Sequence, residues 1–192
     1  LTALVVGGLV SDDRKNGTSA IYFSRPISRL DYASMKWLSA ASVLGAVILL
    51  TYIMDYSAAV VFKGEGWSYI AYTIPIFMGG LTAGILLVFT YTSIGIALSS
   101  ISTSRFTASV SFLGLVLGSK IVAWLIEIQF ETTYIYLLSP YDCLAHVGQW
   151  LVGLPPNYNH PLAVSAVSLI LMNLASLAVF ASRVASLEVT RE

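Results

Sequence analysis

Long apolar stretches alternate with short polar ones along the chain, and this alternation predicts its helices. Four of the stretches are long enough to cross a bilayer, because the hydrocarbon layer needs about 20 apolar residues of helix. They cover residues 37–62, 70–98, 106–126 and 162–181. The first contains one charged residue, Asp55, the third contains Lys120, and the other two contain none. The pattern therefore predicts four membrane-spanning helices.

A shorter apolar run opens the sequence. Residues 1–10 are too few to cross a membrane alone. Because the sequence begins with Leu1 rather than Met, we interpret this run as the inner end of a fifth span whose start is missing. On this interpretation the sequence is a carboxy-terminal fragment, and residues 1–192 form a single transmembrane domain.

The composition also indicates a membrane protein. Of the 192 residues, 57% are hydrophobic and only 10% are charged, and the mean hydropathy is +0.80. A soluble domain of this size would have too few polar side chains to cover its surface. We therefore expect an all-α, multi-pass helix bundle in the cell membrane, in contact with lipids and not with nucleic acid.

The basic residues predict the orientation of the bundle, although the net charge is zero. Cytoplasmic loops of membrane proteins are enriched in lysine and arginine. If the four spans alternate in direction, eight basic residues fall on one side: Arg14, Lys15, Arg25, Arg29, Lys36, Arg105, Arg183 and Arg191. Outside the spans, the other side has Lys63 alone. Residues 11–36 and the carboxyl terminus are therefore predicted to be cytoplasmic.

The cytoplasmic segment before the first long span contains the signals of a short helix. Asn16-Gly17 ends the helix that precedes it, and Thr18 can cap a new helix that contains Ile21 and Phe23. Pro26 ends this short helix, because proline disfavours helical geometry in the residue before it. The result is a partly apolar helix lying across the cytoplasmic face.

A second helix start follows directly. Ser28 and Asp31 match a Ser-x-x-Asp capping box, in which each side chain bonds the backbone N–H of the other residue. This box predicts the start of the helix that enters the first span. For the short helix before it, the residues leave two interpretations: it rests on lipid headgroups, or it docks onto a cytoplasmic partner.

The segment resembles the signature that follows the second span of ABC-type-2 exporter permeases. The resemblance lies in Asp-Asp-Arg-Lys-x-Gly-Thr from Asp12, in Ser-Arg-Pro-Ile-Ser-Arg from Ser24, and in Lys36 at the next span. It extends over about residues 1–181 and includes the Ser-rich turn with Arg105. The first span of the family and most of its second have no counterpart in this sequence.

In that family the segment is a coupling helix that sits in a groove of the ATP-binding subunit. The resemblance implies eight partner-binding residues here: Arg14, Gly17, Thr18, Ile21, Phe23, Arg25, Pro26 and Arg29. It further implies the permease of an ATP-driven exporter, working as a homo- or heterodimer with two ATPase subunits. The chain itself is then not an enzyme. The alternative is a non-transporting subunit that anchors a larger complex.

Two Gly-x-x-x-Gly patterns lie inside predicted spans, Gly80 with Gly84 and Gly114 with Gly118. Glycines at this spacing let two helices approach closely in lipid. Each pair predicts either a contact within the chain or a seam between two permease subunits. The second pair is not a nucleotide-binding loop, because Ser precedes Lys120 and the pattern lies inside a span.

The two charged residues inside the spans, Asp55 and Lys120, are predicted to lie at similar depths in the outer part of the membrane. An unpaired charge at such depth costs several kcal/mol, so we expect the two side chains to form a pair. The alternative is that Lys120 extends outward towards Glu127, while Asp55 lies near the outer water.

Residues 127–160 form a long outer segment with one clear helix signal. Ser139 suits an N-cap, Pro140 the first helical position and Asp142 the third. The helix is predicted to run for about 15 residues until Pro155-Pro156 stops it, which is too short to span a membrane. Its apolar face comprises Cys143, Leu144, Val147, Trp150, Leu151 and Leu154, with Asp142, His146 and Gln149 on other faces.

Two positions for this amphipathic helix remain open. It either rests on the outer leaflet, or it re-enters the membrane, as this loop commonly does in the family that the chain resembles. We favour re-entry, because irregular backbone at membrane depth is tolerated where protein surrounds it. Cys143, His146 and His160 are too few to fix a tetrahedral metal site. We therefore expect neither a metal nor another cofactor.

Overall fold

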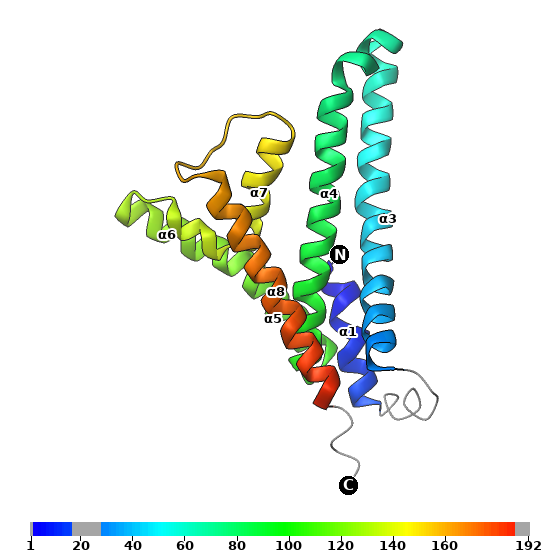
Figure 1. Ribbon diagram of the computed structural model, residues 1–192, viewed down its shortest axis with the longest axis vertical. Coiled ribbons are helices and arrows are strands. Elements are labelled where there is room, and N and C mark those ends of the chain that lie inside the picture. The colour runs from blue at the N-terminus through cyan, green and yellow to red at the C-terminus, as the bar shows by residue number, and fades with distance from the viewer. Residues whose placement is uncertain (1, 17–27, 187–192) are drawn as a thin grey trace.

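The computed structural model describes residues 2–16 and 28–186, and all the regular elements in these ranges are helices (Figure 1). The α-helices are α1 (Thr2–Lys15), α3 (Arg29–Lys63), α4 (Trp67–Ile101), α5 (Arg105–Leu113), α6 (Ser119–Phe130), α7 (Pro140–Leu151) and α8 (Leu162–Ser186). A π-helical turn, η1 (Gly114–Gly118), joins α5 to α6, and a 3-10 helix, η2 (Tyr134–Leu138), precedes α7.

Four helices in the described ranges are long and apolar enough to cross a membrane. They are Leu30–Lys63, Trp67–Ile101, Arg105–Phe130 and Leu162–Ser186. The predicted all-α, multi-pass fold is therefore confirmed. The helices extend beyond the predicted spans, most clearly in α3, which begins at Arg29 rather than at residue 37. Hydropathy detects the part of a helix that suits lipid, whereas the capping box at Ser28 determines where this helix begins.

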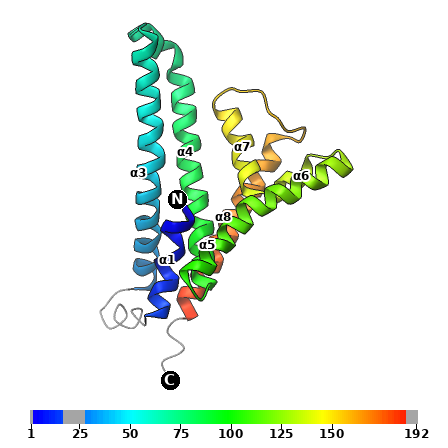
Figure 2. The same cartoon turned by 180° about the vertical axis from the view of Figure 1, so that it is seen from behind.

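The helices form two arms that separate towards one end of the molecule. Helices α3 and α4 make a long antiparallel hairpin, while α6 and α8 lean away from it with α7 between the arms (Figures 1 and 2). The arms meet at the opposite end, where α1 packs against α3, α4 and α5. The carboxyl-terminal end of α8 lies at this same end (Figure 1).

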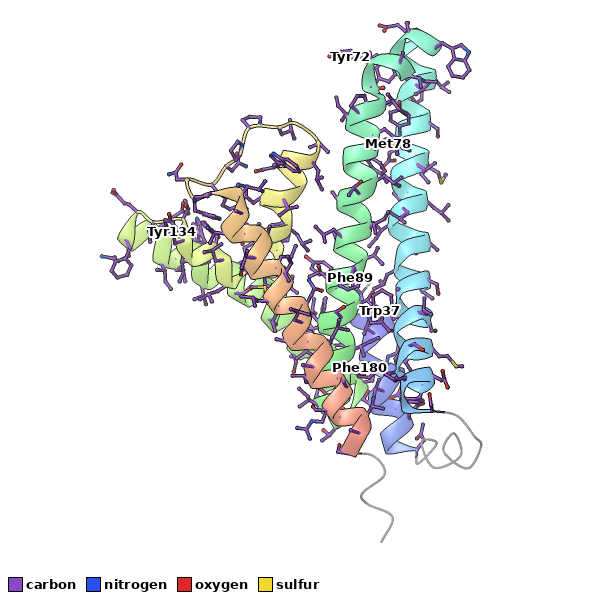
Figure 3. The ribbon with its side chains drawn as sticks, in the orientation of Figure 1. Trp37, Tyr72, Met78, Phe89, Tyr134 and Phe180 are labelled. Carbon is purple, nitrogen blue, oxygen red and sulfur yellow. The ribbon has the colours of Figure 1, made fainter. Side chains whose placement is uncertain are left out.

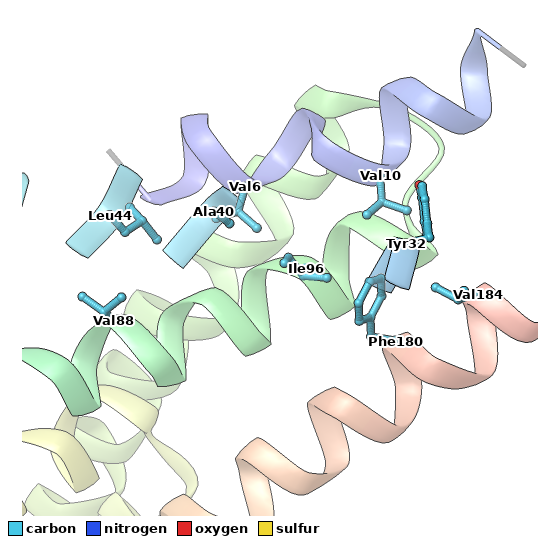
Figure 4. Packing of buried hydrophobic residues seen from close by; sticks show 9 residues of the cluster. All are labelled: Val6, Val10, Tyr32, Ala40, Leu44, Val88, Ile96, Phe180 and Val184. Atoms are coloured by element: carbon cyan, nitrogen blue, oxygen red, sulfur yellow. The ribbon is translucent and has the colours of Figure 1, made fainter. Parts of the chain in front are cut away.

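Helix α4 is the centre of the bundle. In its most apolar stretch 44% of the residues are buried, against 17% in each of the other three spans. Its neighbours include α1, α3, α7 and α8. The main hydrophobic core surrounds its inner half and comprises Val6, Val10, Tyr32, Ala40, Leu44, Val88, Ile96, Phe180 and Val184 (Figure 4). Because α4 touches both arms, it connects the end where the arms meet to the end where they separate.

Most of the remaining apolar side chains project outward from the spans, as lipid-facing residues do (Figure 3). Trp37 is an exception that fixes α3 to α4. Its ring packs 5.2 Å from that of Phe89, and its Nε1–H donates a 3.1 Å hydrogen bond to the Ser93 hydroxyl (Figure 3). A tryptophan with a satisfied N–H can lie inside the bundle without a desolvation penalty.

Candidate functional site

In the sequence, the predicted coupling helix lies between two helices that the structure describes. Six of its eight predicted contact residues lie outside the described residues: Gly17, Thr18, Ile21, Phe23, Arg25 and Pro26. The other two, Arg14 and Arg29, belong to the end of α1 and the start of α3. The local helix signals agree with the sequence, since α1 ends at Lys15 and α3 starts with the Ser28–Asp31 capping box. Residues 11–15 and 29–36 are therefore parts of long helices and not of a separate segment.

A salt bridge ties these two helix ends together. Asp13 on α1 and Lys36 on α3 approach to 2.7 Å, and their side chains are only 15% and 17% exposed. The hydroxyl of Tyr32 donates a 2.8 Å hydrogen bond to the same carboxylate oxygen. We call Asp13, Tyr32 and Lys36 the clamp. It joins the first and the last parts of the sequence signature, which are more than twenty residues apart in the chain.

The Ser-rich turn that contains Arg105 lies beside the clamp. Arg105 Nη2 donates a 2.9 Å hydrogen bond to the carbonyl oxygen of Leu4. Ser99 Oγ accepts hydrogen bonds from the backbone N–H groups of Val10 and Ser11, both at 3.2 Å. A pocket of about 380 Å³ opens between these elements, lined by Leu4, Val5, Gly8, Leu9, Asp12, Asp13, Lys36 and Arg105. The clamp and the turn thus belong to one surface around the ends of the coupling segment.

Between the two arms, α7 begins as the sequence predicts. Ser139 is its N-cap and accepts a hydrogen bond from the Asp142 N–H, with Pro140 at the first helical position. The helix ends at Leu151, however, before it reaches the two prolines. Gly153 has a φ of +75°, and the N–H of Leu154 bonds the carbonyl of Gln149. This is a glycine-based helix stop, and it makes α7 shorter than predicted.

The predicted apolar face of α7 is not its buried face. Cys143 and Leu144 of the apolar face are buried, but Trp150 of the same face is 63% exposed, whereas Asp142 and His146 on other faces are only 4% and 3% exposed. The helical-wheel argument assumes that polar side chains face water. Here Asp142 and His146 face other polar groups of the protein, and only part of the apolar face, including Trp150, is exposed.

Helix α7 lies beside the middle of α4. A Cβ added to Gly79 would overlap the carbonyl oxygen of Leu151, and one added to Gly148 would touch Ala83. Nearer the start of α7, Cys143 and Leu144 belong with Leu169 to a buried cluster against which Leu86, Leu87 and Tyr91 of α4 pack. These α4 residues lie well inside the helix, which runs from residue 67 to 101. The packing therefore favours the re-entrant position and not a helix resting on the outer surface.

The two Gly-x-x-x-Gly patterns behave differently. Gly80 and Gly84 face α3: a Cβ on Gly80 would overlap the ring of Tyr52, and one on Gly84 would lie 2.9 Å from Leu49 Cδ2. Of the two predicted alternatives for Gly80 and Gly84, the structure therefore shows the contact within the chain. At Gly114 and Gly118, a Cβ would meet nothing within 4 Å. The sequence reasoning missed Gly79, because a single glycine next to Gly80 carries no pattern of its own.

The expected pair between Asp55 and Lys120 does not form within the chain. Lys120 Nζ lies 3.7 Å from the ring centroid of Tyr141 on α7, which is a cation–π contact. Within the described residues no salt bridge joins Lys120 to Glu127, which instead accepts a hydrogen bond from the hydroxyl of Tyr136. The prediction is wrong because it compared only the depths of the two charges. Helices α3 and α6 belong to different arms of the bundle (Figure 1).

Asp55 is exposed near the outer tip of the α3–α4 hairpin. Its neighbour Tyr56 hydrogen-bonds Thr73 at 2.9 Å, and Thr73 lies less than two turns from the start of α4. The alternative, in which Asp55 lies near the outer water, stays a prediction. A charged side chain at a helix end can reach water and needs no partner.

The three residues considered for a metal site do not converge. Cys143 Sγ is 3.5 Å from the carbonyl oxygen of Leu137, whereas His146 and His160 meet around a serine, Ser165. Within residues 2–16 and 28–186, no three His, Cys, Asp or Glu side chains are grouped so that they could hold a metal ion.

Helix content, span lengths and packing define a multi-pass α-helical membrane protein, with the clamp between α1 and α3 at one end and α7 packed beside α4 towards the other. Residues 1–181 match the family model described as ABC-2 family transporter protein, and the chain belongs to this family. No curated protein matches the chain. Family membership makes the chain a transmembrane subunit of a transporter that is not itself catalytic. Such subunits typically work with an ATP-binding subunit.

Proposed function

We propose that this chain is the permease subunit of an ATP-driven ABC exporter in the cell membrane, with its carboxyl terminus in the cytoplasm. A separate nucleotide-binding subunit would hydrolyse ATP and bind the coupling segment around residues 17–27. The observation that carries the proposal is the clamp, because it fixes both ends of this segment to the same bundle. A force applied to the segment then acts on α1 and α3 together.

The packing supports a route from the coupling segment to the outer end. Helices α1 and α3 both pack on α4, and α4 in turn packs on α7. Closure of the ATPase subunits would move the clamped helix ends, and α4 would transmit this movement to the re-entrant helix. Displacement of α7 would open the outer end of a path for the substrate. An anchor subunit would assemble in the same way, but ATP would not change the accessibility of α7.

The first prediction concerns docking of the ATPase subunit. Changing Ile21→Asp together with Phe23→Asp is expected to abolish copurification of the ATPase, because the apolar side chains that fill its groove become charged. Membrane insertion should be unchanged, since the segment lies outside the spans. The measurement is a detergent pull-down of the tagged permease followed by an assay for bound ATPase.

A matched control is available in the same segment. Ser19→Asp with Ser24→Asp adds the same charge but keeps both apolar side chains, and this variant is expected to retain the ATPase. Full retention of the ATPase by the Ile21→Asp, Phe23→Asp variant would contradict docking through this helix. The segment would then be an interfacial helix that rests on lipid.

The second prediction concerns the partner permease, which we place against the face that contains Gly114 and Gly118. Gly114→Leu with Gly118→Leu is expected to reduce crosslinking between permease subunits several-fold, because leucine side chains would separate the two backbones. The fold of each subunit should persist, since nothing within 4 Å opposes a Cβ at either glycine. The alanine variants, which add only a methyl group, are the controls, and their crosslinking should decrease less. Unchanged crosslinking in the leucine variant would contradict a subunit interface at this face.

A further inference from the structure

Two histidines share one serine at the outer end of the bundle. His146 of α7 has its Nδ1 2.9 Å from the hydroxyl of Ser165 in α8, and His160 has its Nε2 2.7 Å from the same oxygen. All three residues are buried, with exposures of 3%, 4% and 0%. The two imidazole rings lie 4.9 Å apart and nearly perpendicular to each other. Neither the exporter function nor the re-entrant packing requires this arrangement.

The network extends into the neighbouring segments. His160 Nδ1 lies 3.2 Å from the hydroxyl of Thr133, and the same hydroxyl oxygen accepts the backbone N–H of Asn159 at 3.2 Å. The hydroxyl of Tyr158 donates a 2.9 Å hydrogen bond to Asp142 in the first turn of α7. The outer latch, as we name it, comprises Thr133, Asp142, His146, Tyr158, His160 and Ser165. It connects α7 to α8 and to the loop segments on either side of them.

The chemistry of the shared hydroxyl favours neutral histidines. Ser165 has one proton to donate and can also accept, so it satisfies one ring nitrogen as donor and the other as acceptor. If both rings were protonated, both would be donors and the Ser165 proton would have no acceptor between them. Two positive charges would also face each other across 4.9 Å in a buried site. The closed latch therefore resists proton uptake.

The surrounding groups leave the two histidines as the groups that titrate near neutral pH. The other titratable side chains of α7, of η2 and of the loops around the histidines are Glu131, Tyr134, Tyr136, Tyr141, Asp142, Cys143 and Tyr158, and Glu127 of α6 bonds Tyr136. Burial raises the pKa of the Cys143 thiol to about 11. Burial and the hydrogen bond to Glu127 raise the pKa of Tyr136 to about 12, and burial followed by the Asp142 charge raises the pKa of Tyr158. Both phenols stay neutral. Burial is also the main cause that lowers the pKa of His146 and of His160.

The carboxylate of Asp142 favours the protonated form of a nearby histidine. Its Oδ1 accepts the Tyr158 hydrogen bond, while its buried Oδ2 has no partner among the described residues. It lies one helical turn before His146, so its charge favours a positive imidazole there. The pKa of His146 is nevertheless lowered, first by burial and then by the neighbouring His160.

We propose that the outer latch is a proton-binding site that opens the outer segment in acid. While both rings are neutral, Ser165 holds α7 to α8 and the latch is closed. Once opened, the histidines meet water and regain the ordinary pKa of about 6.5. The open state then binds more protons, so acid stabilises it relative to the closed state as the pH falls below this value. Above about pH 7.5 the latch keeps its full stability.

The test is hydrogen–deuterium exchange of the protein in lipid nanodiscs at pH 7.5 and pH 5.5, corrected for the intrinsic pH dependence of exchange. At one pH unit below the open-state pKa, each histidine that stays neutral in the closed latch is expected to lower protection about tenfold at most. The loss should affect α7 and residues 158–165 and leave α3 unchanged. Equal corrected protection of α7 at both pH values would overturn the proposal, without any variant.

Paired substitutions separate titration from hydrogen bonding. His146→Asn places an amide where Nδ1 bonds Ser165, and His160→Gln places one where Nε2 bonds it, so the double variant keeps the contacts but cannot take up a proton. It is expected to retain protection at pH 7.5 and to lose the acid response. Each single variant should lose part of the response, and Glu127→Gln should keep all of it. A full acid response in the double variant would assign the effect to another group.

Discussion

Gly79→Ala is expected to detach α7 from α4 and to destabilise the protein by about 3 kcal/mol or more, beyond the usual cost of overpacking. The added Cβ would overlap the backbone carbonyl of Leu151 and lie 3.2 Å from the Val152 N. Backbone atoms cannot avoid a clash by changing rotamer. For a chain of this size the loss corresponds to a decrease of roughly 6–12 °C in melting temperature. Thermal unfolding in detergent and exchange protection of α7 measure the two effects.

The same interface supplies the matched control. Gly148→Ala changes the opposite partner, where the new Cβ would lie 3.7 Å from the Ala83 side chain, an ordinary van der Waals distance. Because alanine favours a helix over glycine by about 1 kcal/mol, this variant is expected to be neutral or slightly stabilising. If Gly79→Ala were as stable as Gly148→Ala, α7 would not approach α4 as closely as described.

Asp13→Ala is expected to cost about 2–3 kcal/mol, because it removes the carboxylate to which both Lys36 and Tyr32 bond in a mostly buried site. We also expect loss of coupling: the ATPase subunit should still copurify, but its binding of ATP should no longer change the exposure of α7. Asp13→Asn keeps an acceptor for the Tyr32 hydroxyl without the charge, so this variant should lose less stability than Asp13→Ala.

A double-mutant cycle measures the clamp directly. Asp13→Ala combined with Lys36→Met is expected to lose clearly less stability than the sum of the two single changes, because each single change already breaks the same interaction. Additive losses would mean that the salt bridge contributes no coupling energy. The two halves of the sequence signature would then be neighbours without acting together.

Local signals in this sequence predict local structure well. The capping box at Ser28 and the Ser139-Pro140 start of α7 were correctly predicted, because such motifs act on backbone groups within one helical turn. The four spans follow from hydropathy for a similar reason. A lipid-exposed helix must be apolar along its own length, whatever its neighbours are.

Lateral relationships between helices were harder to predict. Depth along a span can be counted from the sequence, but the lean of the two arms cannot, so Asp55 and Lys120 were paired wrongly. The burial of Asp142 and His146 also depends on distant partners, Tyr158 and Ser165, which the sequence does not bring together. A contact network of this kind leaves no periodic pattern in the chain.

The two adjacent glycines of α4 restrict how that helix can move. Gly79 accommodates the end of α7 and Gly80 accommodates the ring of Tyr52 on α3, so α4 is enclosed on two sides at one level. Rotation of α4 about its own axis would bring a bulkier neighbouring residue into each contact, and both contacts would be lost. Tilting keeps both. A displacement that begins at the clamp should therefore reach the outer end as a tilt that carries α3 and α7 along together.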